Sequence, residues 1–320
     1  MSASGKVTIG LPVFNGENYL AAAIESVLGQ TYRNLELIVC DNASEDRTES
    51  ICRDFAARDQ RVVYHRNPTN IGAAANHNKC VHLATGEYFK WMSHDDLLEP
   101  RYVEECVKAL EADKDAILAQ CIVHCFDMQG RVFEIYDHST WNTGSATQAV
   151  RLHAALCNPR CLEIFGLVRT KSMASSILQG GYTGADRTVV VDLALRGRFV
   201  LVPEPLFLNR DHPNRSSRWT NRLEYLSWWT GQTGQWKCST GLFYRDCLKL
   251  ISRYASSPAD RLSCYRELLH SLRLFGRGRR LFLEPLAAVN PRLIKYVTAA
   301  KRSLSQRRRL AADREMQKQN

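Results

Sequence analysis

Apolar and polar positions along the first 130 residues repeat in two periods, which predict strands and helices in turn. Strands are expected at 7–14, 35–42, 62–65, 87–93 and 115–127, with amphipathic helices between the first four at 19–30, 47–59 and 73–85. Strands and helices that alternate in units of this length predict an α/β fold with a mostly parallel sheet and right-handed crossovers. Ligands of such sheets bind at the carboxyl ends of the strands.

The ends of the first four strands are rich in polar residues. The segments there read PVFNGEN, CDNASED, RNPTNIG and SHDD, and parallel strands bring such segments to one edge of the sheet. The fourth segment ends on two adjacent carboxylates, Asp95 and Asp96, which repel each other and are costly to desolvate. Either a cation binds these acids, or one of them caps the helix that begins near Pro100.

These segments resemble those of the family 2 glycosyltransferases, which are enzymes of the GT-A fold that pass a sugar from a nucleotide diphosphate to a hydroxyl. GLPVFNGENYLAAAIESVLGQTYRNLELIVCDNASED is similar to the opening signature of the family, and NPTNIGAAANHNKCVHLATGEYFKWMSHDD is similar to its second block. The resemblance covers about residues 7 to 215. It implies a GT-A domain at 1–215, with a nucleotide-binding half at 1–125 and an acceptor half at 126–215, followed by a helical, basic region at 216–320.

The resemblance also implies which residues bind the donor, a nucleotide-diphosphate sugar. Asp41 is expected to accept a hydrogen bond from the base. Gly72 has an alternative role as a turn residue. The implied nucleotide-binding residues are Pro12, Phe14, Asn15, Glu17, Asp41, Asn70, Gly72, Asn78, Asp95 and Arg210.

Asp95 and Asp96 stand where the family carries its acidic metal-binding motif. The resemblance therefore implies Mn²⁺ or Mg²⁺, which prefer oxygen ligands and take some of them from substrate phosphates. His212, in the segment RDHPNRSSR, is a further metal or phosphate candidate. Two positions depart from the family pattern, since His77 stands where Arg is common and His94 where Asp or Ser is common.

Transfer with inversion, which the resemblance implies, needs a general base near the acceptor hydroxyl. Asp186, in GADRTVVVDLALRGRF, stands at the matching position. It is either that base or the N-cap of the helix that follows it. Asp192 lies inside the same helix and is expected to be a surface or packing residue.

Eleven cysteines are scattered through expected strands and helices, which is typical of reduced thiols in a reducing compartment. The pairs Cys121/Cys125 and Cys157/Cys161 leave zinc as an alternative, although structural zinc prefers two intervening residues and these pairs have three. No apolar run is long enough to span a membrane, and no signal peptide is recognisable. The expected location is cytoplasmic, either free or peripheral at the inner face of the membrane.

Positive charge is concentrated at the end of the chain, where residues 271–320 contain thirteen Lys or Arg and three acids. The stripe Leu293, Ile294, Val297, Ala300 and Leu304 predicts a helix that either lies on an anionic membrane or packs on the catalytic domain. The hydroxyl acceptor is expected to be a sugar, a lipid-linked sugar or a small molecule.

Other functional classes remain as alternatives. A protein that binds nucleic acid through its basic tail is one, but no RNA- or DNA-binding module precedes the tail and no nucleic acid is expected. A nucleotidyltransferase normally has a Gly-rich basic loop after its first strand, and PVFNGENY lacks one. A non-catalytic homologue that binds a sugar nucleotide is the third.

Overall fold

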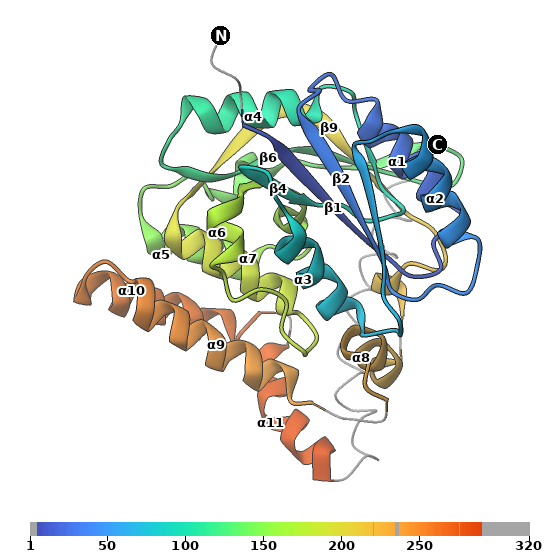
Figure 1. Ribbon diagram of the computed structural model, residues 1–320. Helices are drawn as coiled ribbons and strands as arrows, with labels where there is room; N and C mark the ends of the chain where they lie inside the picture. The colour runs from blue at the N-terminus through green and yellow to red at the C-terminus, as the bar shows by residue number, and fades with distance from the viewer. Residues whose placement is uncertain (1–4, 220, 234–236, 275, 290–320) are drawn as a thin grey trace, which may run out of the picture.

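The computed structural model describes residues 5–219, 221–233, 237–274 and 276–289. A nine-stranded sheet runs through them in the order β3-β2-β1-β4-β8-β6-β9-β5, with β7 paired to β6 (Figure 1). The strands are β1 Val7–Val13, β2 Leu35–Asp41, β3 Val62–Arg66, β4 Tyr88–Trp91, β5 Leu97–Leu98, β6 Ala116–Phe126, β7 Val132–Tyr136, β8 Leu167–Arg169 and β9 Arg198–Arg210.

The helices alternate with the strands in the first half of the chain and follow one another in the last part. The α-helices are α1 Leu20–Leu28, α2 Thr48–Arg58, α3 Ala73–Leu83, α4 Tyr102–Ala112, α5 Gln148–Cys157, α6 Thr170–Ala174, α7 Ala185–Arg196, α8 Arg222–Thr230, α9 Ser239–Tyr254, α10 Pro258–Ser271 and α11 Arg277–Val289. Three short 3₁₀ helices are η1 His138–Trp141, η2 Leu162–Phe165 and η3 Ser216–Arg218.

The sheet is parallel in its first half and mixed in its second. Strands β1 to β4 pair in parallel, and β6 and β9 do so as well. Strands β5, β7 and β8 pair antiparallel with their neighbours. The predicted α/β sheet is therefore present, with parallel pairing throughout the first half and both kinds of pairing in the second. The links from β4 to β5 and from β6 to β7 are too short for the crossover that a parallel pairing requires.

Helices cover both faces of the sheet (Figure 1). One hydrophobic cluster joins β1 and β2 to α1 and α4, and a second joins the opposite face to α3, α5 and α7. Because both faces are covered, β1, β2 and β4 are buried along their whole length. Their sequences accordingly read as apolar runs rather than as an alternation.

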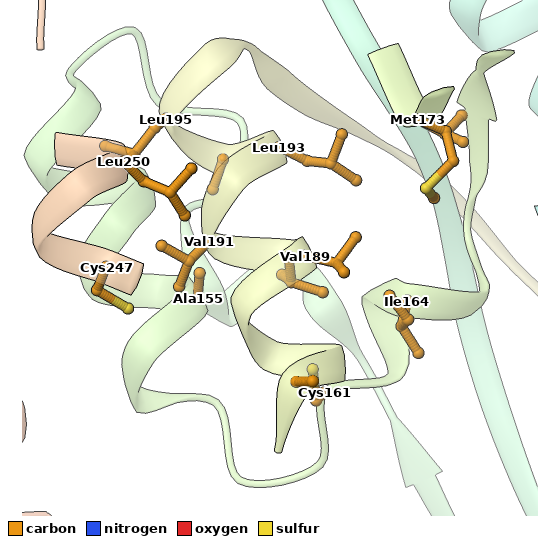
Figure 2. Packing of buried hydrophobic residues seen from close by; sticks show 14 of the residues in the cluster. Ala155, Cys161, Ile164, Met173, Val189, Val191, Leu193, Leu195, Cys247 and Leu250 are labelled. Carbon is orange, nitrogen blue, oxygen red and sulfur yellow. The ribbon is translucent and has the colours of Figure 1, made fainter. Parts of the chain in front are cut away.

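Helices α9 and α10 extend the second cluster beyond α5 and α7. Cys247 and Leu250 of α9 pack towards Val191 and Leu195 of α7, with Ala155 of α5 beside them (Figure 2). Helix α7 thus has apolar neighbours on all sides, and its residues 188–195 are all buried. The last helices share a core with the residues before 215, and the division of the chain at that residue stays a prediction.

Asp192 is the one acid in this buried stretch of α7. It is 1% exposed and accepts a hydrogen bond of 2.6 Å from the backbone N–H of Ile177. Burial raises the pKa of Asp192. Of the two expected roles, surface or packing, the structure assigns the packing role.

Helix α8 is held against the beginning of α3 by two glycines. Gly231 ends α8 in the left-handed conformation, with φ of 70°, and lies on the turn before α3. Gly72 has a φ of 84°, and a Cβ atom there would lie 2.3 Å from the backbone nitrogen of Gly231. Only glycine fits this contact, which confirms that Gly72 has a structural role in the turn.

We expect Gly72→Ala to lower the free energy of unfolding by about 3 kcal/mol or more, because it combines backbone strain with a backbone clash. The control is Gly130→Ala, since Gly130 also has a positive φ, of 78°, but nothing lies within 4 Å of its Cβ position. It should cost about 1–2 kcal/mol. Urea unfolding measures both values, and equal losses would show that the α8 contact is unimportant.

Candidate active site

The two adjacent acids lie where β4 and β9 end. After β4 the chain turns into the short β5, whose Leu97 and Leu98 pair antiparallel with β9. This pairing places Asp95 and Asp96 beside residues that follow them by more than 100 positions. Helix α4 begins only at Tyr102, with Arg101 as its N-cap. The alternative that either acid caps this helix is therefore wrong.

Asp96 is bound to the end of β9. It is 1% exposed, and the side-chain amide of Asn209 donates to its two oxygens at 3.0 and 3.1 Å. The backbone N–H of Arg210 donates to Oδ1 at 2.9 Å. Burial, and after it the charge of Asp95, raises the pKa of Asp96 to about 7.

Asp95 faces an imidazole. Nε2 of His212 lies 2.8 Å from its Oδ2, and the hydroxyl of Ser93 donates to its Oδ1. The guanidinium of Arg210 donates to the backbone carbonyl of Asp95 at 2.9 Å. Burial acts to raise the pKa of Asp95, but His212 and the other hydrogen-bonding and charged groups outweigh it, so that the pKa lies below its usual range.

His212 is itself almost completely buried. Its ring is 6% exposed, and its buried Nδ1 has no hydrogen-bond partner among the described residues. Since Nε2 faces Asp95 and the other ring nitrogen points away from it, a cation that Asp95 and His212 share would be held on the Nε2 side of the ring. These groups fit a divalent cation, because carboxylate oxygens are its preferred ligands.

Within the described ranges, no group of three His, Cys, Asp or Glu side chains could hold a metal ion by itself. A cation at Asp95 and His212 therefore needs further ligands, such as phosphate oxygens. His94 lies against Gly16, where a Cβ atom would be 2.9 Å from its Cδ2, and it is close enough to Asp95 that its charge lowers the pKa of that carboxyl. The eleven cysteines are all free thiols, with Cys121 and Cys125 inside β6 and Cys157 and Cys161 around the end of α5.

The loops after β1 and β2 are tied together next to these acids. The backbone N–H of Asn15 donates to the Ser44 hydroxyl at 2.9 Å, and the Asn15 side chain accepts from Glu45 N–H at 2.9 Å. The carboxylate of Glu17 accepts from the Arg47 guanidinium at 3.1 Å. Asn15 and Glu17 thus shape the loops themselves, and their predicted contacts with a nucleotide stay predictions.

Asp41 ends β2 and has no exposed surface. Its Oδ1 accepts from the backbone N–H of Ser44 at 2.9 Å, and its Oδ2 accepts from the hydroxyl of Tyr64 at 2.7 Å. The carboxylate is therefore fixed in place. Pro12 is buried in β1, and Phe14 is half-buried directly after that strand. Whether these residues contact a base stays a prediction.

Asparagines hold the segments around α3. The side-chain oxygen of Asn70 accepts from Asn42 at 2.8 Å and from the backbone N–H of Gly72 at 2.9 Å. Asn78 makes two hydrogen bonds with the backbone of Gln179, at 3.0 and 2.9 Å. Asn78 thus joins α3 to the segment that leads to Asp186.

Asp186 lies in the first turn of α7. The N-cap is Gly184, with φ of 88°, so the alternative that Asp186 is the N-cap is wrong. One Asp186 oxygen accepts from the neighbouring Arg187 N–H at 2.8 Å. Burial lowers the pKa of His77, and the Ala73 carbonyl and the charge of Asp186 oppose this effect. Asp186 is therefore within electrostatic reach of α3.

Two residues of the site were not predicted. Asn209 binds Asp96, and its signal in the sequence is a single amide at the end of the apolar run of β9. Arg215 lies near both acids, and its positive charge lowers the pKa of each. It stands in the segment RDHPNRSSR, from which only Arg210 and His212 were selected.

Comparison with known proteins gives a family match over the first half of the chain. Residues 8–162 match the model of glycosyl transferase family 2. An uncharacterized glycosyltransferase of Rickettsia typhi is 36% identical over 124 residues, which are 38% of each chain. The glycosyltransferase GlyA of Streptococcus pneumoniae is 34% identical over 110 residues, which are 34% of this chain and 16% of GlyA. The chain thus spans less than half the length of these relatives.

Solved structures resemble the chain over most of its length. Residues 1–349 of S. aureus TarS superpose with a TM-score of 0.66 at 14% identity, covering 90% of this chain and 82% of that one. The mannosyltransferase PcManGT of Pyrobaculum calidifontis gives a TM-score of 0.53 at 15% identity, covering 94% and 85%. At such identities the likeness concerns the fold, and the predicted GT-A fold is confirmed.

We expect Asp96→Asn to stabilise the protein at pH 8 in the presence of a chelator, because the variant removes a buried charge next to Asp95. Between pH 3.8 and about 7, folded Asp96 keeps a proton that the unfolded chain loses, so the wild type loses stability as pH rises through this range. The advantage of the variant should grow by at least about 1 kcal/mol from pH 5 to pH 8.

Urea unfolding at both pH values measures this difference. Asp115→Asn is the control, since the Asp115 side chain is 88% exposed. A difference between wild type and Asp96→Asn that is the same at pH 5 and pH 8 would contradict the raised pKa.

Proposed function

We propose that the protein transfers a sugar from a nucleotide-diphosphate donor to a hydroxyl acceptor, because residues 8–162 match the model of glycosyl transferase family 2. The observation that carries this proposal is the contact of Asp95 with His212 beside the buried Asp96. This contact brings two acids and an imidazole together at the sheet edge where β1, β2 and β4 end.

The donor nucleotide binds over the loops after β1 and β2, with Asp41 as the acceptor of a hydrogen bond from the base. The Asp41 carboxylate is held by Ser44 and Tyr64 and has no exposed surface, so neighbouring side chains must move before a base can donate to it. Two proteins of similar fold support a donor of this class, since TarS has been solved with UDP-GlcNAc and PcManGT with GDP-Man and Mn²⁺.

A divalent cation, Mn²⁺ or Mg²⁺, would be held by Asp95, Asp96 and His212 together with the diphosphate. When bound, it supplies positive charge that stabilises the departing diphosphate. Arg210 and Arg215 add positive charge beside the two acids. The guanidinium of Arg210 is fixed by Asp95 and lies 5.0 Å from the ring centre of Tyr19 and 4.6 Å from that of Phe126.

Asp186 is the general base of the transfer. Its carboxylate takes the proton of the acceptor hydroxyl while that oxygen bonds to the anomeric carbon of the donor. The bond from this carbon to the phosphate oxygen breaks, and its electron pair leaves with the diphosphate. Attack from the face opposite the leaving group inverts the anomeric carbon. We place the reaction in the synthesis of a surface polysaccharide, a glycolipid or a glycosylated metabolite.

We also propose that the protein works in the cytoplasm, at the inner face of the membrane. Among the described residues, no helix is long and apolar enough to cross a membrane. Every exposed charged side chain from 239 to 274 and from 276 to 287 is basic, namely Arg245, Lys249, Arg253, Arg261, Arg266, Arg273 and Arg279. Leu262, Arg266 and Leu269 lie on one stripe of α10, and the two leucines are 52% and 65% exposed.

This combination suits an anionic lipid surface, because the arginines attract the headgroups and the leucines enter the boundary layer. The stripe from Leu293 to Leu304, which predicted the same contact from the sequence, lies outside the described residues. A tail that binds nucleic acid has no comparable support, since exposed leucines give no advantage on a phosphate backbone.

The double variant Leu262→Ser/Leu269→Ser should weaken binding to vesicles of phosphatidylcholine and phosphatidylglycerol about tenfold or more, because both leucines lose their burial in lipid. Vesicle co-sedimentation measures the affinity. Ile135→Ser, on the edge strand β7, is a control at a position that is 62% exposed. Unchanged binding of the double variant, or no binding of the wild type, contradicts the membrane proposal.

For the reaction itself, Asp186→Asn should bind the nucleoside diphosphate normally and lose transfer about 10²- to 10⁴-fold, because it removes only the base. Calorimetry gives the affinity, and release of diphosphate in the presence of acceptor gives the rate. Asp115→Asn serves as the control for an exposed acid. Near-normal turnover of Asp186→Asn refutes the base assignment, and a wild type that binds the donor without any turnover is the non-catalytic homologue.

A further inference from the structure

Four aromatic rings gather on and just before α8. Their ring centres are 5.5 Å apart for Trp219 and Trp228, and 5.4 Å apart for Tyr225 and Trp228. Tyr225 and Trp229 stack with an angle of 7° between their planes. We call Trp219, Tyr225, Trp228 and Trp229 the aromatic cluster.

The aromatic cluster is held rigidly at three points. Arg222, at the start of α8, forms an ion pair with the fully buried Glu284 of α11. The indole N–H of Trp229 donates to the carbonyl of Gly180 at 2.8 Å. At the other end of α8 the backbone of Gly231 rests on Ile71 and Gly72. Rings held in this way lose little freedom when a ligand binds them.

The cluster lies next to the proposed base. Gly180 belongs to the segment that leads to Asp186, and the ring centre of Trp229 lies 5.8 Å from that of His77. Burial and then the charge of Asp186 raise the pKa of Tyr225, so this carboxylate acts on a ring of the cluster as well as on His77. The segments of α3, α7 and α8 thus meet around Asp186.

Only one of the four rings is buried. Trp229 is 6% exposed, whereas Trp219, Tyr225 and Trp228 are half-buried and present part of their surface to solvent. Tyr225 and Trp228 thus pack against the core on one side and leave ring surface accessible to a ligand on the other. Aromatic faces carry negative charge, and the C–H groups on one side of a sugar ring carry positive charge, so the two surfaces attract each other.

We propose that the aromatic cluster is the acceptor-binding site and that the acceptor is a carbohydrate, whose ring lies on Tyr225 and Trp228 and directs a hydroxyl to Asp186. This inference rests on the proposed function and narrows its acceptor from any hydroxyl compound to a sugar. The proposed membrane contact involves another surface, the exposed leucines of α10. The cluster fixes the sugar by its apolar side, which leaves the hydroxyls on its rim free to react.

The test uses the full-length protein and, as donor, the sugar nucleotide from which it releases diphosphate. The acceptor probes are the methyl glycosides of glucose, galactose, mannose and N-acetylglucosamine. In the wild type, at least one glycoside should increase the release of diphosphate. Trp228→Ala should raise the KM for that glycoside about tenfold, and Trp228→Phe should restore most of the loss, because a ring remains. Phe133→Ala, at a 53% exposed aromatic position on β7, should leave this KM unchanged.

A separate calorimetric titration of Trp228→Ala with the nucleoside diphosphate distinguishes the two binding sites. Unchanged diphosphate affinity with a raised glycoside KM supports the inference. Weakened diphosphate affinity assigns the cluster to the donor site and overturns it, as does an unchanged glycoside KM or a wild type that no glycoside activates. If the wild type binds no diphosphate at all, the proposed function fails first and this inference fails with it.

Discussion

The hydrogen bonds between the two adjacent carboxylates and the end of β9 are the constraint on which the site depends. Asp95 and Asp96 are both buried, and without partners two neighbouring charges would be costly there. Asn209, Arg210 and His212 supply these partners, and the short pairing of β5 with β9 brings them together. The same pairing adds β5 to the sheet antiparallel to β9, so this edge of the sheet and the chemistry of the site depend on one contact.

The other side of the site depends on a contact between backbones. Gly72 and Gly231 allow α8 to approach α3 more closely than any side chain would permit, and Asn78 ties α3 to the segment before Asp186. Helices α3 and α8 therefore both approach Asp186 of α7. The contacts that hold them there join segments that are distant in sequence. The acids are thus bound to the end of β9, whereas the segment before Asp186 is bound to α3, which is consistent with separate donor and acceptor sites.

The sequence predicted the parts of this arrangement that depend on local patterns. Strands β1, β2, β3, β4 and β6, the helices between them and the polar strand ends all follow from hydrophobic periodicity. It could not predict β5, whose two residues carry no periodic signal, or that Asn209 binds Asp96 across 113 positions. Both helix-cap alternatives were wrong because a cap is decided by backbone conformation, and the chain places Arg101 and Gly184 at those positions instead. A role in a turn was one of two alternatives predicted for Gly72, but its partner Gly231 could not be predicted, since the contact joins segments that are distant in sequence.

The central claim is that the acids at the end of β4, with His212, form a cation-dependent site for a nucleoside diphosphate. Calorimetric titration of the wild type and of Asp96→Ala with UDP, GDP and dTDP, each with Mn²⁺ and with chelator, tests it most directly. The account predicts that the wild type binds one of the three tightly, that chelator abolishes this binding, and that Asp96→Ala does not bind it. Failure of the wild type to bind any of them, or equal binding by the variant, would contradict the account.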